Sequence, residues 1–343
     1  MYYGLLLLLV SACYSPQLYR CLIERGSMKF LDLFSGIGGF RLGLERAGHI
    51  PVGWVEIDKF ARQSYQAMYD TTGEWTATDI NKVTDEEWRK FNGTVELIAG
   101  GFPCQSFSIA GKREGFLNKT KGTLFFEVAR AVKQIKPRFV FLENVKGLLN
   151  HDKGNTFRTI LSTFDELGYD VQWRVLNSKD FGVPQNRERV YIIGHLRGDS
   201  GREVFSIFGE NREVNQSTIN VVDNTDQPKV MVKEATKKGY DVATVGDSIN
   251  ISQPNSKTRR GRVGHGIANT LVTGSEQATL TSEYRIRKLT PRECWRLQAF
   301  PDELFDKAQQ AGLSDSQLYK QAGNSVTVNV IEYIGNMIVE VEE

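Results

Sequence analysis

The chain has 343 residues, of which 40% are hydrophobic and 24% charged, and its formal net charge is +2. This length predicts one large α/β domain and one smaller domain, and near-neutrality means that a nucleic-acid-binding face must concentrate its basic residues locally. The four cysteines form no CxxC pair and no metal-ligand spacing, and four cysteines in a chain this long do not indicate a disulfide framework. The four scattered histidines argue against a zinc site. We therefore expect a reducing, cytoplasmic location and no metal.

The first 27 residues precede the first clear strand pattern. The apolar run Gly4–Val10, followed by Ser11-Ala12-Cys13, resembles a bacterial lipoprotein signal, but no basic residue precedes it. The run is also far too short to span a membrane as a helix. Because Met28 stands directly before a strand pattern, we interpret residues 1–27 as an upstream extension outside the fold, and we expect no membrane association.

From Met28 to about His195, strand patterns alternate with helix patterns. The predicted strands are Lys29–Leu33, Val52–Ile57, Val95–Ala99, Phe139–Leu142, Val171–Leu176 and Val190–Ile193. The predicted helices are Phe40–Ala47, Lys59–Met68 and Leu124–Ile135. Strands separated by helices predict an α/β fold with a doubly wound, mostly parallel sheet.

After Arg197 the pattern changes. Residues 198–284 are polar, weakly periodic and rich in Asn, Ser, Thr and Gly, which is typical either of a disordered insert or of a small irregular domain. The apolar pieces Val230–Val232 and Ile267–Val272 favour the small domain. Regular structure is predicted to resume with the helices Pro291–Ala299 and Val328–Val339.

A glycine-rich turn follows the first strand directly and predicts close approach of the backbone to a ligand. Its spacing is not G-x-G-x-x-G, which favours a nucleoside without phosphates over a dinucleotide. Glu56 ends the second strand 20 residues after Gly36, where a carboxylate can accept hydrogen bonds from ribose hydroxyls. Asp79 can accept one from an adenine amino group. Either acid alone is more simply a solvated carboxylate, but their places at successive strand ends favour a cofactor site.

Cys104 follows the third strand through Gly100-Gly101-Phe102-Pro103. A lone cysteine is usually structural, but the carboxyl end of a strand is where ligand sites lie in such sheets. A thiol has a pKa of about 8.5, so a nucleophilic one needs positive charge or a helix N-terminus nearby.

Glu143 ends the next strand directly after an apolar stretch. Burial there raises the pKa of a carboxyl group and lets it hold a proton, although helix capping or a salt bridge at the sheet edge is the simpler alternative. Arg187 and Arg189 reach the same edge, or else pair with Glu188 on the surface.

These segments resemble, in content and order, those of the DNA cytosine-5 methyltransferases, and the resemblance covers Met28 to about Ile338. The matching segments are Asp32–Phe40, Pro103-Cys104-Gln105, Glu143-Asn144-Val145, Gln185–Arg189, Arg287–Glu293 and Gly323–Val326. The chain looks most like the compact bacterial and phage enzymes of restriction–modification type. The resemblance implies a monomeric enzyme that uses S-adenosyl-L-methionine on double-stranded DNA. A cognate restriction endonuclease, if there is one, acts on the same site without a stable complex.

The resemblance also implies catalytic roles. Cys104 attacks carbon 6 of a flipped-out cytosine, while Glu143 bonds ring nitrogen 3 and the exocyclic amine and protonates the ring. Arg189 touches the cytosine carbonyl oxygen, and Arg187 lies near the flanking phosphates and the thiolate. Carbon 5 then takes the methyl group, and loss of its proton with elimination of Cys104 releases 5-methylcytosine. Flipping the base costs a few kcal/mol.

Cofactor and DNA contacts follow from the same resemblance. Phe34 stacks on the adenine, and Ile57 stands where several relatives place an aromatic residue. The implied cofactor contacts are Phe34, Gly36, Gly38, Gly39, Glu56, Ile57, Asp79, Ile80, Pro103, Asn324, Ser325 and Val326. Residues 106–121 are either a solvated surface loop or a loop that closes over DNA. The expected DNA contacts are Gln105, Ser108, Lys112, Arg113, Lys257, Arg259, Arg260, Arg262 and Thr270.

We expect residues 28–197 with 318–343 to form the catalytic and cofactor-binding domain, 198–286 the target recognition domain and 287–317 a hinge. A transfer-RNA cytosine-5 methyltransferase of the related family is the main alternative, but its usual Cys-Phe-Thr tripeptide is absent. A nicotinamide-dependent oxidoreductase explains Glu56 but not Pro103-Cys104 with Glu143. A non-catalytic DNA-binding relative is opposed by the intact Cys104 and Glu143.

Overall fold

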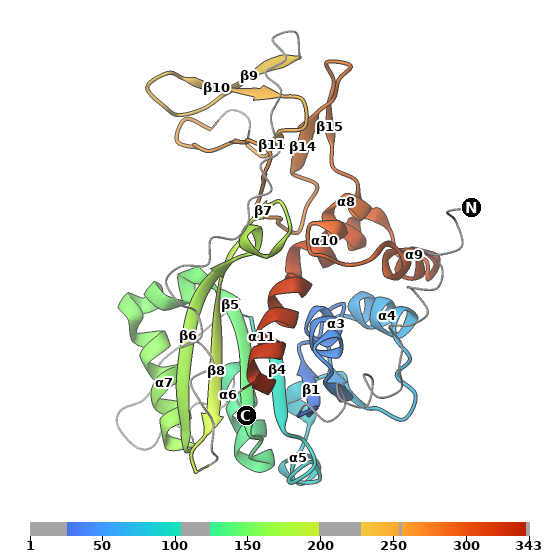
Figure 1. The fold of residues 1–343 in the computed structure, drawn as a ribbon, viewed down its shortest axis with the longest axis vertical. Helices are drawn as coiled ribbons and strands as arrows, with labels where there is room; N and C mark the ends of the chain where they lie inside the picture. The colour runs from blue at the N-terminus through green and yellow to red at the C-terminus, as the bar shows by residue number, and fades with distance from the viewer. Residues whose placement is uncertain (1–25, 104–123, 199–227, 254–255, 341–343) are drawn as a thin grey trace, which may run out of the picture.

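The computed structural model describes residues 26–103, 124–198, 228–253 and 256–340. Its centre is a seven-stranded sheet in the order β3-β2-β1-β4-β5-β8-β6 (Figure 1). The strands are β1 (Lys29–Leu33), β2 (Ile50–Val55), β3 (Trp75–Ala77), β4 (Leu97–Gly101), β5 (Phe139–Val145), β6 (Tyr169–Asn177) and β8 (Glu188–Leu196). All neighbours are parallel except β8, which is antiparallel to both β5 and β6. The predicted doubly wound, mostly parallel sheet is confirmed.

Helices cover both faces of the sheet because its strands alternate large apolar residues between the two sides. On β5, Val140 and Leu142 face one buried cluster, whereas Phe139 and Phe141 face another. The helices are α3 (Gly39–Arg46), α4 (Lys59–Met68), α5 (Asp85–Arg89), α6 (Leu124–Ile135), α7 (Asn155–Glu166) and α11 (Val328–Glu340), with short 3-10 turns η1 (Ile80–Lys82), η3 (Lys146–Gly154) and η4 (Ser178–Phe181). Residues of α5, α6 and α7 join the first cluster, and those of α3 and α11 join the second.

A smaller β region lies above the carboxyl ends of the sheet strands (Figure 1). It contains the hairpin β9 (Lys229–Lys233) and β10 (Tyr240–Thr244), and a four-stranded sheet of β12 (Val263–Gly264), β11 (Ser248–Asn250), β14 (Gln277–Leu280) and β15 (Ile286–Lys288). Val232, Ile249 and Leu280 belong to its own buried core. The described part of this region is therefore a packed small domain, as predicted, and not a disordered insert.

Of the predicted apolar piece Ile267–Val272, only Ala268–Asn269 forms a strand, β13. It pairs in parallel with β7 (Gln185–Asn186), which lies just before β8. The small domain is thereby joined by main-chain hydrogen bonds to the segment that leads into β8 of the large sheet.

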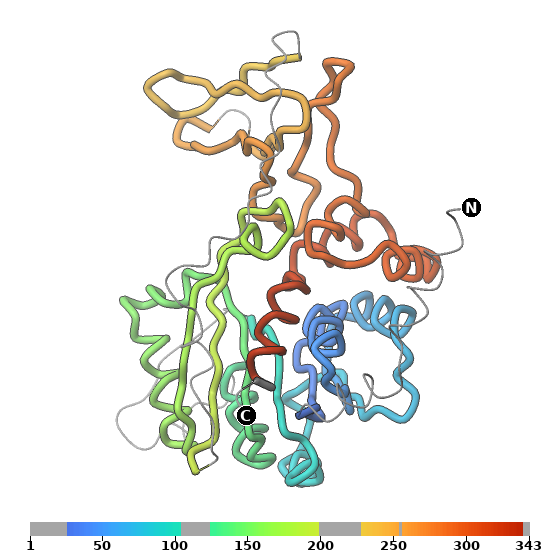
Figure 2. The backbone as a smooth tube through the Cα atoms, viewed as in Figure 1, coloured from blue at the N-terminus to red at the C-terminus, as the bar shows by residue number. Residues whose placement is uncertain are grey.

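The chain returns to the large sheet through three helices, α8 (Pro291–Arg296), α9 (Asp302–Gln310) and α10 (Asp315–Asn324), as the tube in Figure 2 shows. Thr290 and Glu293 form a capping box at the start of α8, with a proline in its first turn. The sequence did not predict α9 and α10, which bury Phe305 and Leu318 against Trp295. Within the described ranges, no helix is both long and apolar enough to cross a membrane.

Candidate active site

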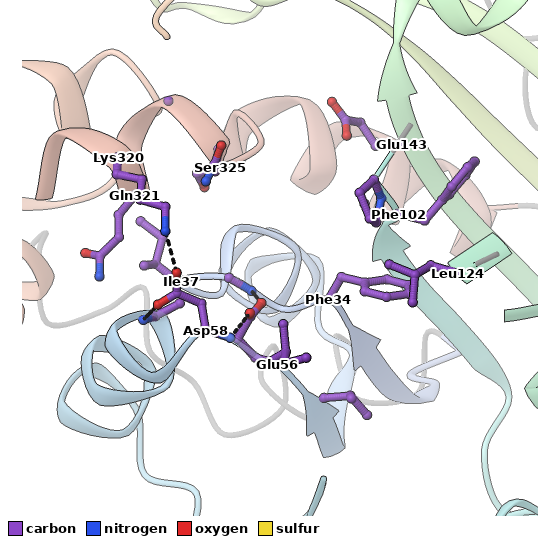
Figure 3. Close-up of a pocket in the computed structure, with 18 of the residues that line it drawn as sticks. Phe34, Ile37, Glu56, Asp58, Phe102, Leu124, Glu143, Lys320, Gln321 and Ser325 are labelled. Carbon is purple, nitrogen blue, oxygen red and sulfur yellow. Dashed lines mark hydrogen bonds and ion pairs between the residues drawn. The ribbon is translucent and has the colours of Figure 1, made fainter. Parts of the chain in front are cut away.

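A cavity of about 440 Å³ opens where β1, β2, β4 and β5 end (Figure 3). Parallel strands bring their carboxyl ends to one edge of a sheet, so residues distant in sequence meet there. The predicted site residues that line it are Phe34, Gly36, Glu56, Ile57, Asp79, Ile80, Pro103, Glu143, Arg187, Arg189, Asn324 and Ser325. Gly38, Gly39 and Val326 lie behind this lining: a Cβ on Gly39 would fall 2.7 Å from Val326.

Glu56 anchors the glycine turn. Its Oε2 accepts a hydrogen bond from the Gly36 amide at 2.8 Å, and its Oε1 accepts one from the Asp58 amide at 2.7 Å. Gly36 and Gly38 have φ of 54° and 79°, in the left-handed region that favours glycine. Burial raises the pKa of Glu56. Because a carboxylate offers about four lone-pair sites, Glu56 retains acceptor capacity for hydroxyl groups in the cavity.

Asp79 and the apolar side chains of Phe34 and Ile57 also line the cavity. Asp79 follows β3 and caps η1, its Oδ1 accepting from the amide and the side-chain nitrogen of Asn81 at 3.0 and 2.8 Å. These hydrogen bonds from Asn81 lower the pKa of Asp79. Ile57 is 68% exposed at the cavity rim, and Phe34, at the end of β1, lies close to Leu124 (Figure 3). Phe34 and Ile57 give the cavity an apolar lining, and Asp79 adds a carboxylate to the same cavity.

Glu143 and Arg189 form an ion pair deeper in the cavity. The Nε of Arg189 lies 3.0 Å from Oε1 of Glu143, and both side chains are nearly buried. Burial raises the pKa of Glu143, and the two guanidinium groups of Arg189 and Arg187 oppose that rise. The sequence-based expectation of a raised Glu143 pKa is met, and Glu143 is also salt-bridged, which was the simpler alternative.

Arg187 is buried and turned toward the main chain. Its Nη2 donates to the carbonyl oxygens of Gly323 and Ser325 at 3.0 and 2.6 Å, and its Nη1 donates to the carbonyl of Leu271 at 3.3 Å. Burial lowers its pKa to about 10, which still leaves it charged at neutral pH. Through three hydrogen bonds from two nitrogens, Arg187 thus joins its own segment to Leu271 and to the turn 323–325.

Sequence reasoning missed two groups that shape the cavity. Asn144 is buried and its Nδ2 donates to the carbonyl of Phe102 at 2.7 Å, which ties the ends of β4 and β5 together. Lys320 on α10 pairs with Asp58 at 2.6 Å across the cavity rim (Figure 3). Asn144 stands beside Glu143 in a segment already singled out, whereas no pattern in the sequence marks Lys320.

Comparison with known proteins identifies the family. The sequence profile described as C-5 cytosine-specific DNA methylase matches residues 28–340. The chain belongs to this family. It is 38% identical over 331 residues to the Type II methyltransferase M.SsoII of Shigella sonnei, covering 92% of this chain and 81% of the relative. It is 37% identical over 323 residues to the Type II methyltransferase M.HhaI of Haemophilus parahaemolyticus, covering 90% and 93%.

The fold agrees with that assignment. The crystal structure of the S. pombe Dnmt2 methyltransferase superposes with a TM-score of 0.57 at 20% identity, over 91% of this chain and 98% of that one. At this identity the likeness shows the fold alone. The protein is a DNA cytosine-5 methyltransferase, and the matched residues 28–340 include the whole cavity described above.

Several residues predicted for this methyltransferase lie outside the described ranges, namely Cys104, Gln105, Ser108, Lys112 and Arg113. In the described part of the chain, no three His, Cys, Asp or Glu side chains are grouped so that they could hold a metal ion.

The predicted basic DNA face is divided by the structure. Lys257 and Arg260 are exposed, and Arg259 is half-buried. Arg262 is only 6% exposed, and its guanidinium donates to the carbonyl oxygens of Asn250 and Lys233. These donors of Arg262 therefore serve main-chain carbonyls inside the small domain. Thr270, the other predicted contact here, donates through Oγ1 to the carbonyl of Asn186 at 2.6 Å.

Proposed function

We propose that this methyltransferase transfers a methyl group from S-adenosyl-L-methionine to carbon 5 of a flipped-out cytosine in a specific duplex DNA sequence, through a covalent bond between Cys104 and carbon 6. One observation carries the proposal: the Glu143–Arg189 pair and the anchored Glu56 line the same cavity. A target base held by the pair and a nucleoside held by Glu56 therefore meet in one space.

The residues of the cavity fit S-adenosyl-L-methionine. Its volume of about 440 Å³ lies within the usual range for small-molecule sites. Glu56 would accept from the ribose hydroxyls, Asp79 from the adenine amine, and Phe34 and Ile57 would flank the adenine ring. The amide of Gly36 already donates to the carboxylate of Glu56. The negative charge of Glu56 would repel a pyrophosphate, so the turn suits a nucleoside without one. When bound, the cofactor supplies an electrophilic methyl group on a sulfonium.

Glu143 and Arg189 are proposed to hold the cytosine and move its proton. Cys104, as the thiolate, forms a bond to carbon 6 while the electron pair of the 5,6 double bond shifts toward the ring. Glu143, whose pKa is raised by burial, would give its proton to ring nitrogen 3, and Arg189 would donate to the carbonyl oxygen. Carbon 5 would thereby become the nucleophile for the methyl group that the cofactor supplies. Loss of the carbon 5 proton to solvent, return of the nitrogen 3 proton to Glu143 and departure of Cys104 as its thiolate would restore the aromatic ring.

The hydrogen bond from Asn144 to the carbonyl of Phe102 supports the placement of the nucleophile. Phe102 is two residues before Cys104 in the sequence, so this hydrogen bond fixes the described main chain just ahead of the proposed nucleophile. Pro103 between them restricts the main chain further. These features support Cys104 as the partner of Glu143.

We infer that residues 198–286 recognise the target and residues 287–317 act as a hinge. The catalytic part comprises 28–197 and 318–343. Lys257, Arg259, Arg260 and Thr270 contact DNA, together with Gln105, Ser108, Lys112 and Arg113 of the loop after Cys104. We also propose that the enzyme acts as a monomer on cytoplasmic DNA and protects it from an endonuclease of the same specificity. Type II is part of the names of M.SsoII and M.HhaI, which supports the restriction–modification setting.

Bisulfite sequencing of DNA from a host that expresses the protein tests this proposal and reveals the target sequence. We expect one short sequence context to be protected from conversion, and the same host expressing Cys104→Ser to show none. Mass spectrometry of DNA incubated with the purified enzyme and S-adenosyl-L-methionine should detect 5-methylcytosine. Absence of 5-methylcytosine in both experiments contradicts the proposal.

A further inference from the structure

The segment 268–273 of the small domain lies against the wall of the cofactor cavity. Gly323, at the end of α10, shows this contact most directly. A Cβ atom on Gly323 would fall 2.3 Å from the carbonyl oxygen of Val272 and 2.8 Å from the amide nitrogen of Thr273. Gly323 does not have a positive φ, so glycine is required here for close approach and not for backbone conformation.

The peptide groups of Leu271 are both held by side chains of the β7–β8 segment. Its amide donates to Oε1 of Gln185 at 3.0 Å, and its carbonyl accepts from Nη1 of Arg187 at 3.3 Å. Gln185 is fully buried and Arg187 is 3% exposed. Buried polar groups of this kind specify one arrangement, because any shift leaves a donor or acceptor without a partner.

The side chains of Gln185 and Arg187 also contact the C-terminal part of the chain. Nη2 of Arg187 donates to the carbonyls of Gly323 and Ser325, and Ser325 lines the cofactor cavity. Nε2 of Gln185 donates at 2.8 Å to the carbonyl of Leu297, which follows α8. Movement of Leu271 therefore breaks its hydrogen bonds to Gln185 and Arg187, and Arg187 is the same side chain that holds residues 323–325.

We propose that Gln185 and Arg187 are positioning residues that couple occupancy of the DNA site to occupancy of the cofactor cavity, by locking segment 268–273 onto the turn 323–325. Thr270 stands in the locked segment and Asn324 in the locked turn, so each ligand orders the wall that the other needs. The inference rests on the proposed function, since it takes DNA and S-adenosyl-L-methionine as the two ligands. Such coupling is reciprocal: each ligand raises the affinity of the other by one common factor.

The test measures that factor directly. Binding of S-adenosylhomocysteine to the full-length protein is titrated by calorimetry, alone and with a duplex oligonucleotide that carries the sequence mapped by bisulfite sequencing. We expect the duplex to raise the affinity of the wild type by about 5-fold or more. In Gln185→Leu the ratio of the two affinities should fall toward one. If the role of Gln185 is purely structural, Gln185→Leu lowers the melting temperature, or lowers the S-adenosylhomocysteine affinity equally with and without the duplex. The ratio of those two affinities then stays as in the wild type.

A second variant and a control keep the result decisive. Gly323→Ala suits a helix better than glycine does, so its cost comes from the contact with Val272 and Thr273; it should also lose the coupling, and it decides the matter if Gln185→Leu does not fold. Thr163→Val removes a buried hydrogen bond to Thr159 on α7 and should keep the wild-type ratio.

The possible failures are distinguishable. A wild type that binds neither S-adenosylhomocysteine nor the duplex contradicts the proposed function itself. If the wild type binds both ligands but its S-adenosylhomocysteine affinity is the same with and without the duplex, only the coupling is overturned. The coupling is also overturned if folded Gln185→Leu and Gly323→Ala variants keep the wild-type ratio of these two affinities.

Discussion

The Nε atom of Arg189 lies 3.0 Å from Oε1 of Glu143, across two antiparallel strands of the central sheet. In the register of β5 and β8, Arg189 pairs with Val145, so Glu143 and Arg189 stand two positions apart on one face. The ion pair lies at the strand ends, in the cavity that Gly36 of the glycine turn also lines, so a base and a cofactor can be brought together there. A guanidinium here restrains the carboxyl group without removing its capacity to hold a proton, since burial still raises the pKa of Glu143.

Glu143→Gln should slow formation of the covalent adduct, because an amide cannot give its proton to the ring. General acid catalysis contributes about 100-fold or more, and we expect a loss of that order in the single-turnover rate. DNA affinity should change little. Glu188→Gln is the matched control, because Glu188 pairs with Lys146 at the surface. A Glu143→Gln variant as fast as wild type removes Glu143 from the role of acid.

The alkaline limb of the pH–rate profile should report Glu143. Its raised pKa means that the protonated form, and the folding stability associated with it, are present at low pH and are lost as pH rises through the folded-state pKa. Arg189→Met removes a charge that lowers this pKa, so the alkaline limb should move to higher pH while the maximal rate falls. Single-turnover rates at saturating DNA measure this. Lys146→Met should leave the limb in place, and movement of the limb to lower pH in Arg189→Met contradicts the assignment.

Glu56→Ala should weaken binding of S-adenosyl-L-methionine while leaving DNA affinity at low salt nearly unchanged. The carboxylate is proposed to accept from ribose hydroxyls, and it also accepts from the amides of Gly36 and Asp58, so its loss removes both the contact and the support of the turn. Calorimetry with S-adenosylhomocysteine measures the effect. Glu166→Ala, an exposed acid on α7, serves as control. Unchanged cofactor affinity in Glu56→Ala excludes the proposed contact.

Cys104→Ser should form no adduct with DNA whose target cytosine carries fluorine at carbon 5. With fluorine in place of the proton, the final elimination stalls, and the wild-type adduct should survive denaturing electrophoresis. An alcohol is much less ionised and a poorer nucleophile than a thiol. Cys294→Ser is the matched control, because Cys294 is buried and burial raises its pKa to about 12. An adduct in Cys104→Ser, or none with wild type on a DNA that it methylates, overturns the nucleophile.

Arg260 and Arg262 should behave differently although they are two residues apart. Arg260→Ala should reduce the salt slope of DNA binding by about one, as expected for a lost phosphate contact. Arg262→Ala should leave that slope unchanged but destabilise the small domain by about 1–3 kcal/mol, because the carbonyls of Asn250 and Lys233 lose their donors. Salt titrations and thermal melts measure the two effects, and the opposite result places Arg262 on DNA.

Local pattern by itself determined much of this protein. The predicted bounds of β1, α4 and α6 coincide with the observed ones, because period-2 and period-3.6 repeats of apolar residues reflect how each segment is buried. The place of Glu56 directly after β2 also follows from the chain, whereas β3, which precedes Asp79, was not among the predicted strands. Matching segments in order were sufficient to name the family.

Only the tertiary structure decided which polar groups face ligands and which face the protein. The antiparallel direction of β8 and the helices α9 and α10 depend on packing against distant elements. Arg187 and Arg262 show the reason most clearly. An arginine carries the same charge and five donors whether it lies on a surface or in a core. Its role is set by carbonyl oxygens that reach it from elsewhere in the chain: Leu271, Gly323 and Ser325 for Arg187, and Asn250 and Lys233 for Arg262.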